Sequence, residues 1–216
     1  MAGQLDGMRV AILVTDNFEQ VELTGPRDAL DAEGAVCTIV SDKPGRVQGM
    51  NHLDKAEQFD VGALLDEVRA SDFDAVLLPG GAINADRLRA IPQAQAFVRK
   101  IAQDGKPIAV ICHGAWLLAS AGLVGGRTLT SWPTLQDDLR NAGARWTDEE
   151  VVVDGNWVSS RKPSDIPAFN REMLALFAEF TPEFRRSLHR AEPRELPGAL
   201  VSGNPGTESD TTTRQS

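Results

Sequence analysis

The chain has 216 residues, of which 42% are hydrophobic and 25% are charged, a composition typical of one soluble globular domain. Its 22 lysines and arginines against 31 aspartates and glutamates give a formal charge of −9, so nucleic-acid phosphates would repel it. No apolar run reaches the ~18 residues of a transmembrane helix. The N-terminus also lacks the features of a secretion signal. We therefore expect a cytoplasmic protein that binds neither nucleic acid nor membrane.

Strand-like and helix-like segments alternate along the chain. In chain order, we predict a strand at 9–15, a helix at 21–33, a strand at 36–41, a loop or small hairpin at 43–60, a strand at 75–78, a helix at 92–104, a strand at 108–111, a helix at 114–121, strands at 127–130, 151–154 and 157–160, and a helix at 166–180. Short, fully apolar strands that alternate with helices indicate a parallel sheet covered on both faces.

The predicted fold is therefore an α/β sandwich of the flavodoxin-like kind, mostly parallel, with helices on both faces. We assign it to residues 1–180. From 181 to 216 the chain is polar and ends in GNPGTESDTTTRQS, which cannot bury apolar area, so we expect this segment to be disordered. The chain has two cysteines and three scattered histidines, too few for a disulfide framework or a zinc cluster, and we expect no metal or cofactor.

Ligands bind at the carboxyl ends of parallel strands, and one such end carries a candidate nucleophile. The strand at 108–111 runs into Cys112, His113 and Gly114 and then into a helix. This strand-turn-helix order predicts a nucleophile elbow at Cys112. The free N–H groups at the start of the helix would favour a thiolate there. Cys37 lies inside the strand VCTIV, so we interpret it as an inert core residue.

Four motifs in order carry a family resemblance: FEQVEL at 18–23, LPGG at 78–81, AVICHGAWLLASAGLVGGRTLTSWP at 109–133 and EVVVDGNWVSSR at 150–161. They resemble the ThiJ/PfpI superfamily, which has a class I glutamine amidotransferase-like fold. The PfpI-like branch, with its general stress proteins and intracellular proteases, is most similar. The resemblance covers residues 8 to 180.

The resemblance implies a role for several residues. Cys112 matches the nucleophile and Glu22 matches the carboxyl that hydrogen-bonds its sulfur. A carboxyl that donates to sulfur must be protonated, so we expect a raised pKa for Glu22. His113 would act beside the thiol, whereas Glu19 would lie at the rim of the site.

The resemblance also implies that a neighbouring subunit completes the site. Its segment after the two glycines supplies an acid that orients the histidine, and Asp86 is the matching candidate, although this loop is one residue longer than usual. The chain is therefore expected to form a homodimer or a higher homo-oligomer. The backbone N–H groups of Gly80, Gly81 and His113 are candidates for holding an oxyanion.

Two tryptophans depart from the family pattern. Trp116 stands in the segment that is usually Pro-Gln, and Trp132 replaces a frequent Tyr. Both are expected at the rim of the pocket.

The implied function is a stress-related, cysteine-dependent enzyme acting on electrophilic carbonyls. Three reactions stay open: deglycation, glyoxalase chemistry and peptide hydrolysis. The expected partner is a small carbonyl or a glycated molecule, or a peptide. The alternative is a redox-sensing or chaperone-like protein that uses oxidation of Cys112 without turnover. An amidotransferase triad is disfavoured because the only later histidine, His189, lies in the polar tail.

Overall fold

The computed structural model describes residues 3–181, so the predicted tail lies outside these residues except for Thr181. A seven-stranded sheet with the order β11-β12-β8-β7-β1-β3-β6 forms its centre. Every neighbouring pair in it is parallel except β11 with β12. These strands are β1 Arg9–Leu13, β3 Val36–Ser41, β6 Ala63–Leu64, β7 Ala75–Leu78, β8 Ile108–Ile111, β11 Val151–Asp154 and β12 Trp157–Ser160. The predicted, mostly parallel α/β fold is confirmed.

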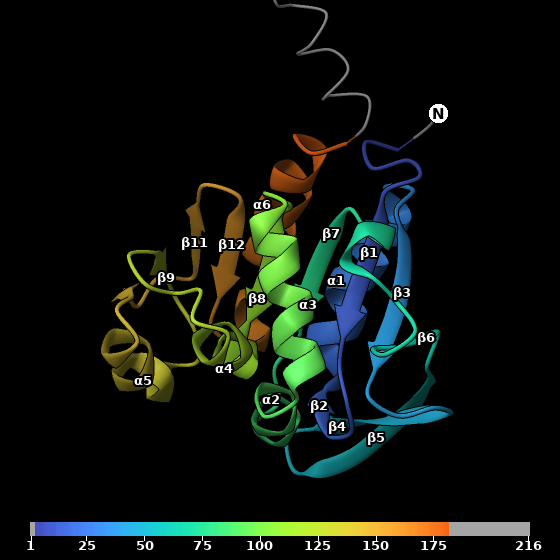
Figure 1. Ribbon diagram of the computed structural model, residues 1–216, viewed down its shortest axis with the longest axis horizontal. Coiled ribbons are helices and arrows are strands. Elements are labelled where there is room, and N and C mark those ends of the chain that lie inside the picture. Colours follow the sequence, from blue (N-terminus) through green and yellow to red (C-terminus); the bar gives the residue numbers. More distant parts are fainter. Residues whose placement is uncertain (1–2, 182–216) are drawn as a thin grey trace, which may run out of the picture.

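Helices cover both faces of this sheet, with α3 in front and α1 and α6 behind it in Figure 1. The helices of the described part are α1 Gln20–Ala32, α2 Ala82–Arg89, α3 Pro92–Gln103, α4 Ala115–Ser120, α5 Gln136–Asn141 and α6 Ile166–Ala178. None of them is both long and apolar enough to cross a membrane.

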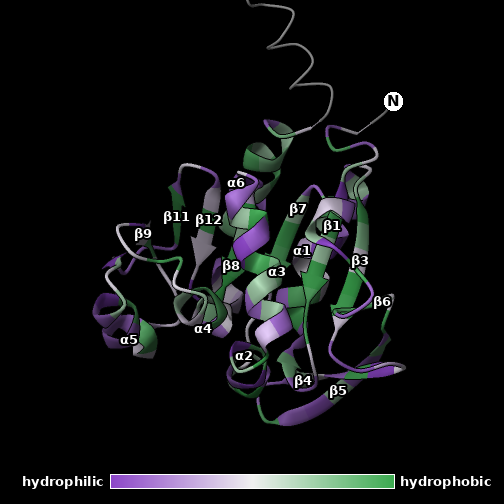
Figure 2. Ribbon diagram, viewed as in Figure 1, coloured by the Kyte–Doolittle hydropathy of each residue, from purple (hydrophilic) through white to green (hydrophobic). Residues whose placement is uncertain are grey.

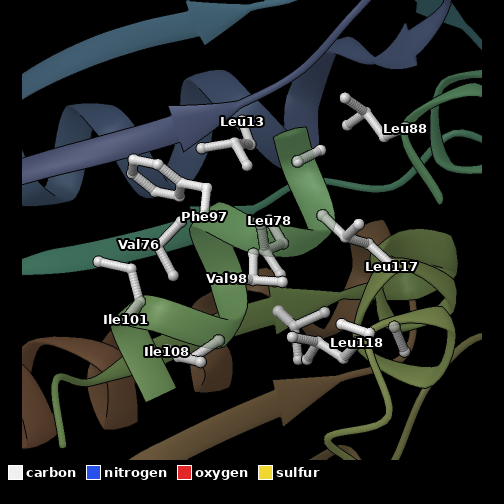
Figure 3. Close-up of a cluster of buried hydrophobic side chains, with 14 of the residues drawn as sticks. Leu13, Val76, Leu78, Leu88, Phe97, Val98, Ile101, Ile108, Leu117 and Leu118 are labelled. Atoms are coloured by element: carbon white, nitrogen blue, oxygen red, sulfur yellow. The ribbon is translucent and has the colours of Figure 1, made fainter. Parts of the chain in front are cut away.

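Each face of the sheet has its own apolar core. Figure 2 shows the hydrophobic colouring concentrated on the central strands, and Figure 3 shows one cluster, in which Phe97 and Val98 of α3 meet Val76 and Leu78 of β7. The second cluster joins the opposite face of the sheet to α1 and α6 and includes the fully buried Phe169. Because β7 and β8 are buried on both faces, they read as continuous apolar runs in the sequence.

A hairpin extends below the sheet in Figure 1, where the sequence predicts a loop or hairpin excursion. Its strands are β4 Arg46–Asn51 and β5 Asp54–Asp60, and β4 also pairs with β2, Phe18–Glu19. This pairing places the tip of the hairpin beside the start of α1, next to the candidate site described below.

The local structure differs from the expectation in one strand and adds two helices. The predicted strand at 127–130 shortens to β9, Thr128–Leu129, and pairs outside the main sheet with β10, Arg145–Trp146. The helices α2 and α5 were not predicted, because they have only eight and six residues. Cys37 is half-buried in β3 and packs against the second apolar core, which agrees with its interpretation as a core residue.

Candidate active site

The candidate nucleophile lies on a sharp turn between β8 and α4. Cys112 follows the last residue of β8 and begins a 3-10 turn, Cys112–Gly114, from which α4 continues. Its φ is +62°, in the left-handed region that residues with a side chain rarely occupy. Gly114 allows the turn to pack on β7, because a Cβ there would lie 2.5 Å from the carbonyl oxygen of Leu78. The turn thus places the thiol at the carboxyl edge of the sheet.

Glu22, in the first turn of α1, is completely buried beside the thiol. The Gly80 N–H donates to its Oε2 at 2.8 Å. Its Oε1 has no hydrogen-bond partner among the described residues, and the carboxyl lies close enough to the Cys112 thiol for the pKa of each group to depend on the other. Burial is the main cause that raises the pKa of Glu22 to about 8, so this carboxyl is protonated at neutral pH. The predicted upward shift is confirmed.

The thiol itself is less acidic than the sequence suggests. Cys112 is 6% exposed, and burial is the largest effect that raises its pKa, followed by the negative charge of an ionised Glu22. The N–H groups of His113 and Gly81 hydrogen-bond the sulfur and lower this pKa, but by less. Enclosure of the turn thus opposes the thiolate that the sequence analysis expects at Cys112, whereas the two N–H donors favour it, and α4 has only six residues.

Glu22 and Cys112 form one coupled pair. When Glu22 keeps its proton, the carboxyl carries no charge and can donate a hydrogen bond to sulfur, which favours the thiolate. When Glu22 loses its proton, the carboxylate opposes a second negative charge beside it. Activation of the thiol therefore depends on a protonated Glu22 and on a nearby base.

His113 is the base within reach. Its Nδ1 lies 3.2 Å from the Cys112 sulfur. Burial lowers the pKa of His113 to about 4, so the ring is neutral at pH 7. In the tautomer that carries its proton on Nε2, Nδ1 can accept the thiol proton. The sequence places His113 next to Cys112, but only the left-handed turn folds the ring back toward the sulfur.

The two glycines that follow β7, Gly80 and Gly81, have different roles in the site. The Gly80 N–H is already bonded to Glu22, so in this geometry it is not free to hold an oxyanion. A Cβ on Gly80 would lie 2.5 Å from Glu22 Oε2 and 2.7 Å from the Cys112 Cβ, which is why the carboxyl and the thiol can approach here. The N–H groups of Gly81 and His113 point at the sulfur and remain candidates for stabilising an oxyanion.

Asp86 lies apart from these groups within one chain. It is exposed on α2, and no hydrogen bond or ion pair of the described residues joins it to His113. Its donation across a subunit interface stays a prediction.

Asn84, also on α2, is a residue that the sequence analysis missed. Its side chain is fully buried, accepts from the Thr15 N–H at 2.8 Å, and donates to the carbonyls of Pro79 at 3.3 Å and Gly80 at 2.9 Å. It therefore ties the end of β1 to the Pro-Gly-Gly turn. The only signal in the sequence was a polar residue close behind two glycines.

A pocket of about 310 Å³ opens over the thiol. Its lining residues are Asn17, Glu19, Glu22, Met50, His52, Leu53, Gly81, Ala82, Ile83, Cys112, His113, Trp132 and Pro163. Glu19 and Trp132 are thus at the pocket, as predicted, whereas Trp116 contacts His113 without lining it. Within residues 3–181, no three His, Cys, Asp or Glu side chains are grouped so that they could hold a metal ion.

Known proteins resemble this chain in sequence and in fold. The sequence model of the DJ-1/PfpI family matches residues 8–176. A deglycase of Thermococcus kodakarensis is 44% identical over 78% of this chain and 99% of its own length. General stress protein 18 of Bacillus subtilis is 41% identical over 79% of this chain and 98% of its own. The solved structure of Drosophila melanogaster DJ-1beta, 26% identical, superposes with a TM-score of 0.72 over 85% of this chain and 98% of that one. This chain therefore belongs to the DJ-1/PfpI family.

Proposed function

We propose that this chain is a cysteine-dependent deglycase, which releases amines from their early adducts with small dicarbonyl compounds. The observation that carries the proposal is the convergence of four groups on one sulfur. These are the Nδ1 atom of His113, the protonated carboxyl of Glu22, and the N–H groups of Gly81 and His113. The relative from Thermococcus kodakarensis, named a deglycase, supports the same reaction class.

The groups around the sulfur suit a nucleophilic substitution. As the sulfur attacks the adduct carbon that bears the amine, Nδ1 of His113 takes the thiol proton in the same step. As the S–C bond forms, the C–N bond breaks, and the amine leaves with the proton held by His113. Water then cleaves the S–C bond: its hydroxyl joins the carbon, which leaves as a hydrated dicarbonyl, and its proton returns to the sulfur and restores the thiol. The N–H groups of Gly81 and His113 would stabilise negative charge on the neighbouring carbonyl oxygen.

The pocket favours small substrates over long ones. Its volume of about 310 Å³ suits a three-carbon fragment with part of the attached side chain, whereas a peptidase needs an extended cleft. Apolar side chains of Met50, Leu53, Ile83 and Trp132 form much of its wall. We therefore favour deglycation over peptide hydrolysis. Glyoxalase chemistry, in which a free dicarbonyl is hydrated and rearranged, is the closely related reaction.

A sensing role is the second candidate. The pair of Cys112 and a protonated Glu22 could equally hold an oxidised sulfur, and General stress protein 18 is among the relatives of this chain. This role needs no turnover, so measured turnover separates the two proposals.

The deciding experiment follows the loss of a preformed adduct between methylglyoxal and an arginine or lysine derivative. A deglycase removes the adduct faster than the adduct releases methylglyoxal spontaneously, and its rate rises with enzyme concentration. A protein that only consumes free methylglyoxal reaches a ceiling at the spontaneous rate. We expect the wild type to remove the adduct faster than it releases methylglyoxal spontaneously, and Cys112→Ala to give no acceleration. A ceiling at the spontaneous rate would refute deglycation and leave glyoxalase chemistry.

A further inference from the structure

The buried amide of Asn84 holds two consecutive carbonyls of the Pro-Gly-Gly turn, residues 79–81. Its Nδ2 donates to the carbonyl oxygen of Pro79 at 3.3 Å and to that of Gly80 at 2.9 Å. Its Oδ1 accepts from the Thr15 N–H at 2.8 Å. The side chain is completely enclosed, so water cannot take over any of these bonds. One amide thus bonds three backbone groups at the carboxyl edge of the sheet.

The direction of a carbonyl in this turn fixes the direction of the N–H group that follows it. The peptide bonds on both sides of Gly80 are trans. A trans peptide unit is planar, and its C=O and N–H bonds point to opposite sides of the chain. A carbonyl that is turned toward Asn84 therefore turns the N–H of the same peptide unit away from Asn84.

The two N–H groups fixed in this way both face the reacting pair. The Gly80 N–H, in the same peptide unit as the Pro79 carbonyl, donates to Glu22 Oε2 at 2.8 Å. The Gly81 N–H, in the same unit as the Gly80 carbonyl, lies at the Cys112 sulfur. Each N–H group stabilises negative charge on the group that it faces. Asn84 thus acts on the carboxyl and on the thiol through two peptide units.

The third bond of Asn84 holds the other side of the site. Thr15 is buried and lies two residues after the end of β1. From there the chain continues through β2 into α1, which carries Glu22 in its first turn. The bond to Thr15 therefore holds the start of the Glu22 segment against the turn whose N–H group binds Glu22.

The turn itself has little that would keep its N–H groups in place. Its two glycines have no side chains, and Gly81 has a φ of +85°, a conformation that glycine adopts readily. The Gly80 carbonyl also accepts from the Glu19 N–H, but at the longer distance of 3.4 Å. Because glycine backbone is permissive, a side chain that bonds both carbonyls restricts the turn strongly.

We propose that Asn84 is a positioning residue, which orients the Gly80 and Gly81 N–H groups toward Glu22 and Cys112 and so sets the reactivity of the thiol. The kinetic consequence rests on the proposed function, whereas the orientation of the two N–H groups does not. Without the amide the two peptide units can rotate. The carboxyl and the sulfur then each lose a donor that stabilises the charged form, so both hold their protons more firmly.

The experiment changes the amide in three ways. Asn84→Ala removes it, Asn84→Leu removes it but fills its volume, and Asn84→Ser leaves one O–H group, which can hold only one of the two carbonyls. The matched control is Asn156→Ala. Asn156 also bonds backbone, donating to the Lys106 carbonyl at 2.7 Å, but it lies between β11 and β12 at the amino end of β8. Urea unfolding measures the stability of every variant.

Three readouts follow the effect on the site. The first is the pH titration of the Gly80 and Gly81 amide signals by NMR, in which the Gly80 amide of the wild type should follow the ionisation of Glu22. The second is the pH profile of Cys112 alkylation, and the third is kcat and KM for the adduct. The other ionisable groups at the site, His113, Glu19 and His52, are the same in all variants, and no substitution changes the charge.

We expect the Gly80 amide of Asn84→Ala and Asn84→Leu to lose at least about half of its titration amplitude, because its N–H no longer points at the carboxyl. The alkylation profile should move up by about one pH unit. The kcat should fall by about tenfold with KM within about twofold, since no binding surface is lost. Asn84→Ser should lie between these variants and the wild type, and Asn156→Ala should match the wild type even where it is equally destabilised.

Two results would overturn the proposal. One is a folded Asn84 variant whose Gly80 titration and alkylation profile equal those of the wild type, and Asn84→Ser decides this if the other two do not fold. The other is the same shifts in Asn156→Ala, which would make them a consequence of lost stability. The NMR and alkylation readouts need no turnover. They therefore decide the positioning role even if the wild type proves not to be a deglycase.

Discussion

The two cysteines of this chain show how surroundings decide what a thiol can do. Cys37 lies in the regular strand β3, half-buried, and Asp31 accepts a hydrogen bond from its thiol, which holds the proton on sulfur. Cys112 is more deeply buried, yet it lies on a left-handed turn with hydrogen-bond donors and a histidine around the sulfur. Burial raises the pKa of both thiols. Reactivity therefore comes from the neighbours that can take the proton and stabilise the charge.

The strongest test of this contrast removes each sulfur. Cys112→Ala should lose at least about a thousandfold of adduct turnover, because the nucleophile is gone, whereas Cys37→Ala should stay within about twofold. In the folded wild type, brief iodoacetamide treatment followed by mass spectrometry should label Cys112 faster than Cys37. Faster labelling of Cys37 would show that the donors at Cys112 do not activate it.

A smaller but still large effect is expected at Gly80. In Gly80→Ala, the new Cβ would push Glu22 and Cys112 apart, and we expect turnover to fall by about a hundredfold. Gly125→Ala is the matched control, since a Cβ there would meet only one atom, 3.9 Å away, and should be neutral. Equal activity of the two variants would mean that close approach of carboxyl and thiol is not required.

The buried carboxyl should be visible in the pH dependence of stability. The pKa of Glu22 is about 8 in the folded chain against an ordinary 4.5, so between these values the unfolded chain has lost a proton that the folded chain keeps. The free energy of unfolding contributed by Glu22 is therefore greatest below pH 4.5 and falls as the pH rises to 8, by up to about 4 kcal/mol.

Glu22→Gln has no proton to lose and should lack this fall. Urea unfolding at pH 5, 6.5 and 8 checks it, with the exposed Glu67→Gln as control. His113 acts in the opposite direction, because its pKa is lowered to about 4 and its contribution is lost as the pH falls from 6.5. That term is common to all three proteins and cancels in their differences. If the free energy of unfolding depended on pH in the same way for the wild type and for Glu22→Gln, Glu22 would not be the group that keeps its proton in the folded chain.

The smallest effect concerns oxidation. Under mild peroxide, Cys112 should form a sulfinic acid before Cys37 does, and the protonated Glu22 should donate to its oxygens. In Glu22→Gln the amide is a weaker donor, and we expect about threefold less sulfinate by intact mass at equal peroxide. Identical oxidation of both proteins would remove the main support for a sensing role.

The fold class and the identity of the nucleophile could be predicted from patterns that are local in the sequence. Four-residue apolar runs such as β7 and β8 indicate strands buried on both faces, and a cysteine directly after such a strand is expected at the carboxyl edge of the sheet. The length of the segments between the runs allows helices, so the α/β sandwich follows from spacing. The family motifs added Glu22, which composition alone could not have distinguished from a solvated residue.

The tertiary structure alone decided what surrounds the sulfur. Asn84, Trp116 and Trp132 come from separate segments, and only the packing of α2, α4 and the loop after β9 brings them to the site. The acidity of Cys112 was likewise set by enclosure and by a carboxyl ninety residues away in the chain, which no local pattern encodes. Side-chain contacts and burial depend on three-dimensional distance, whereas periodicity records only which face of a strand or helix is apolar.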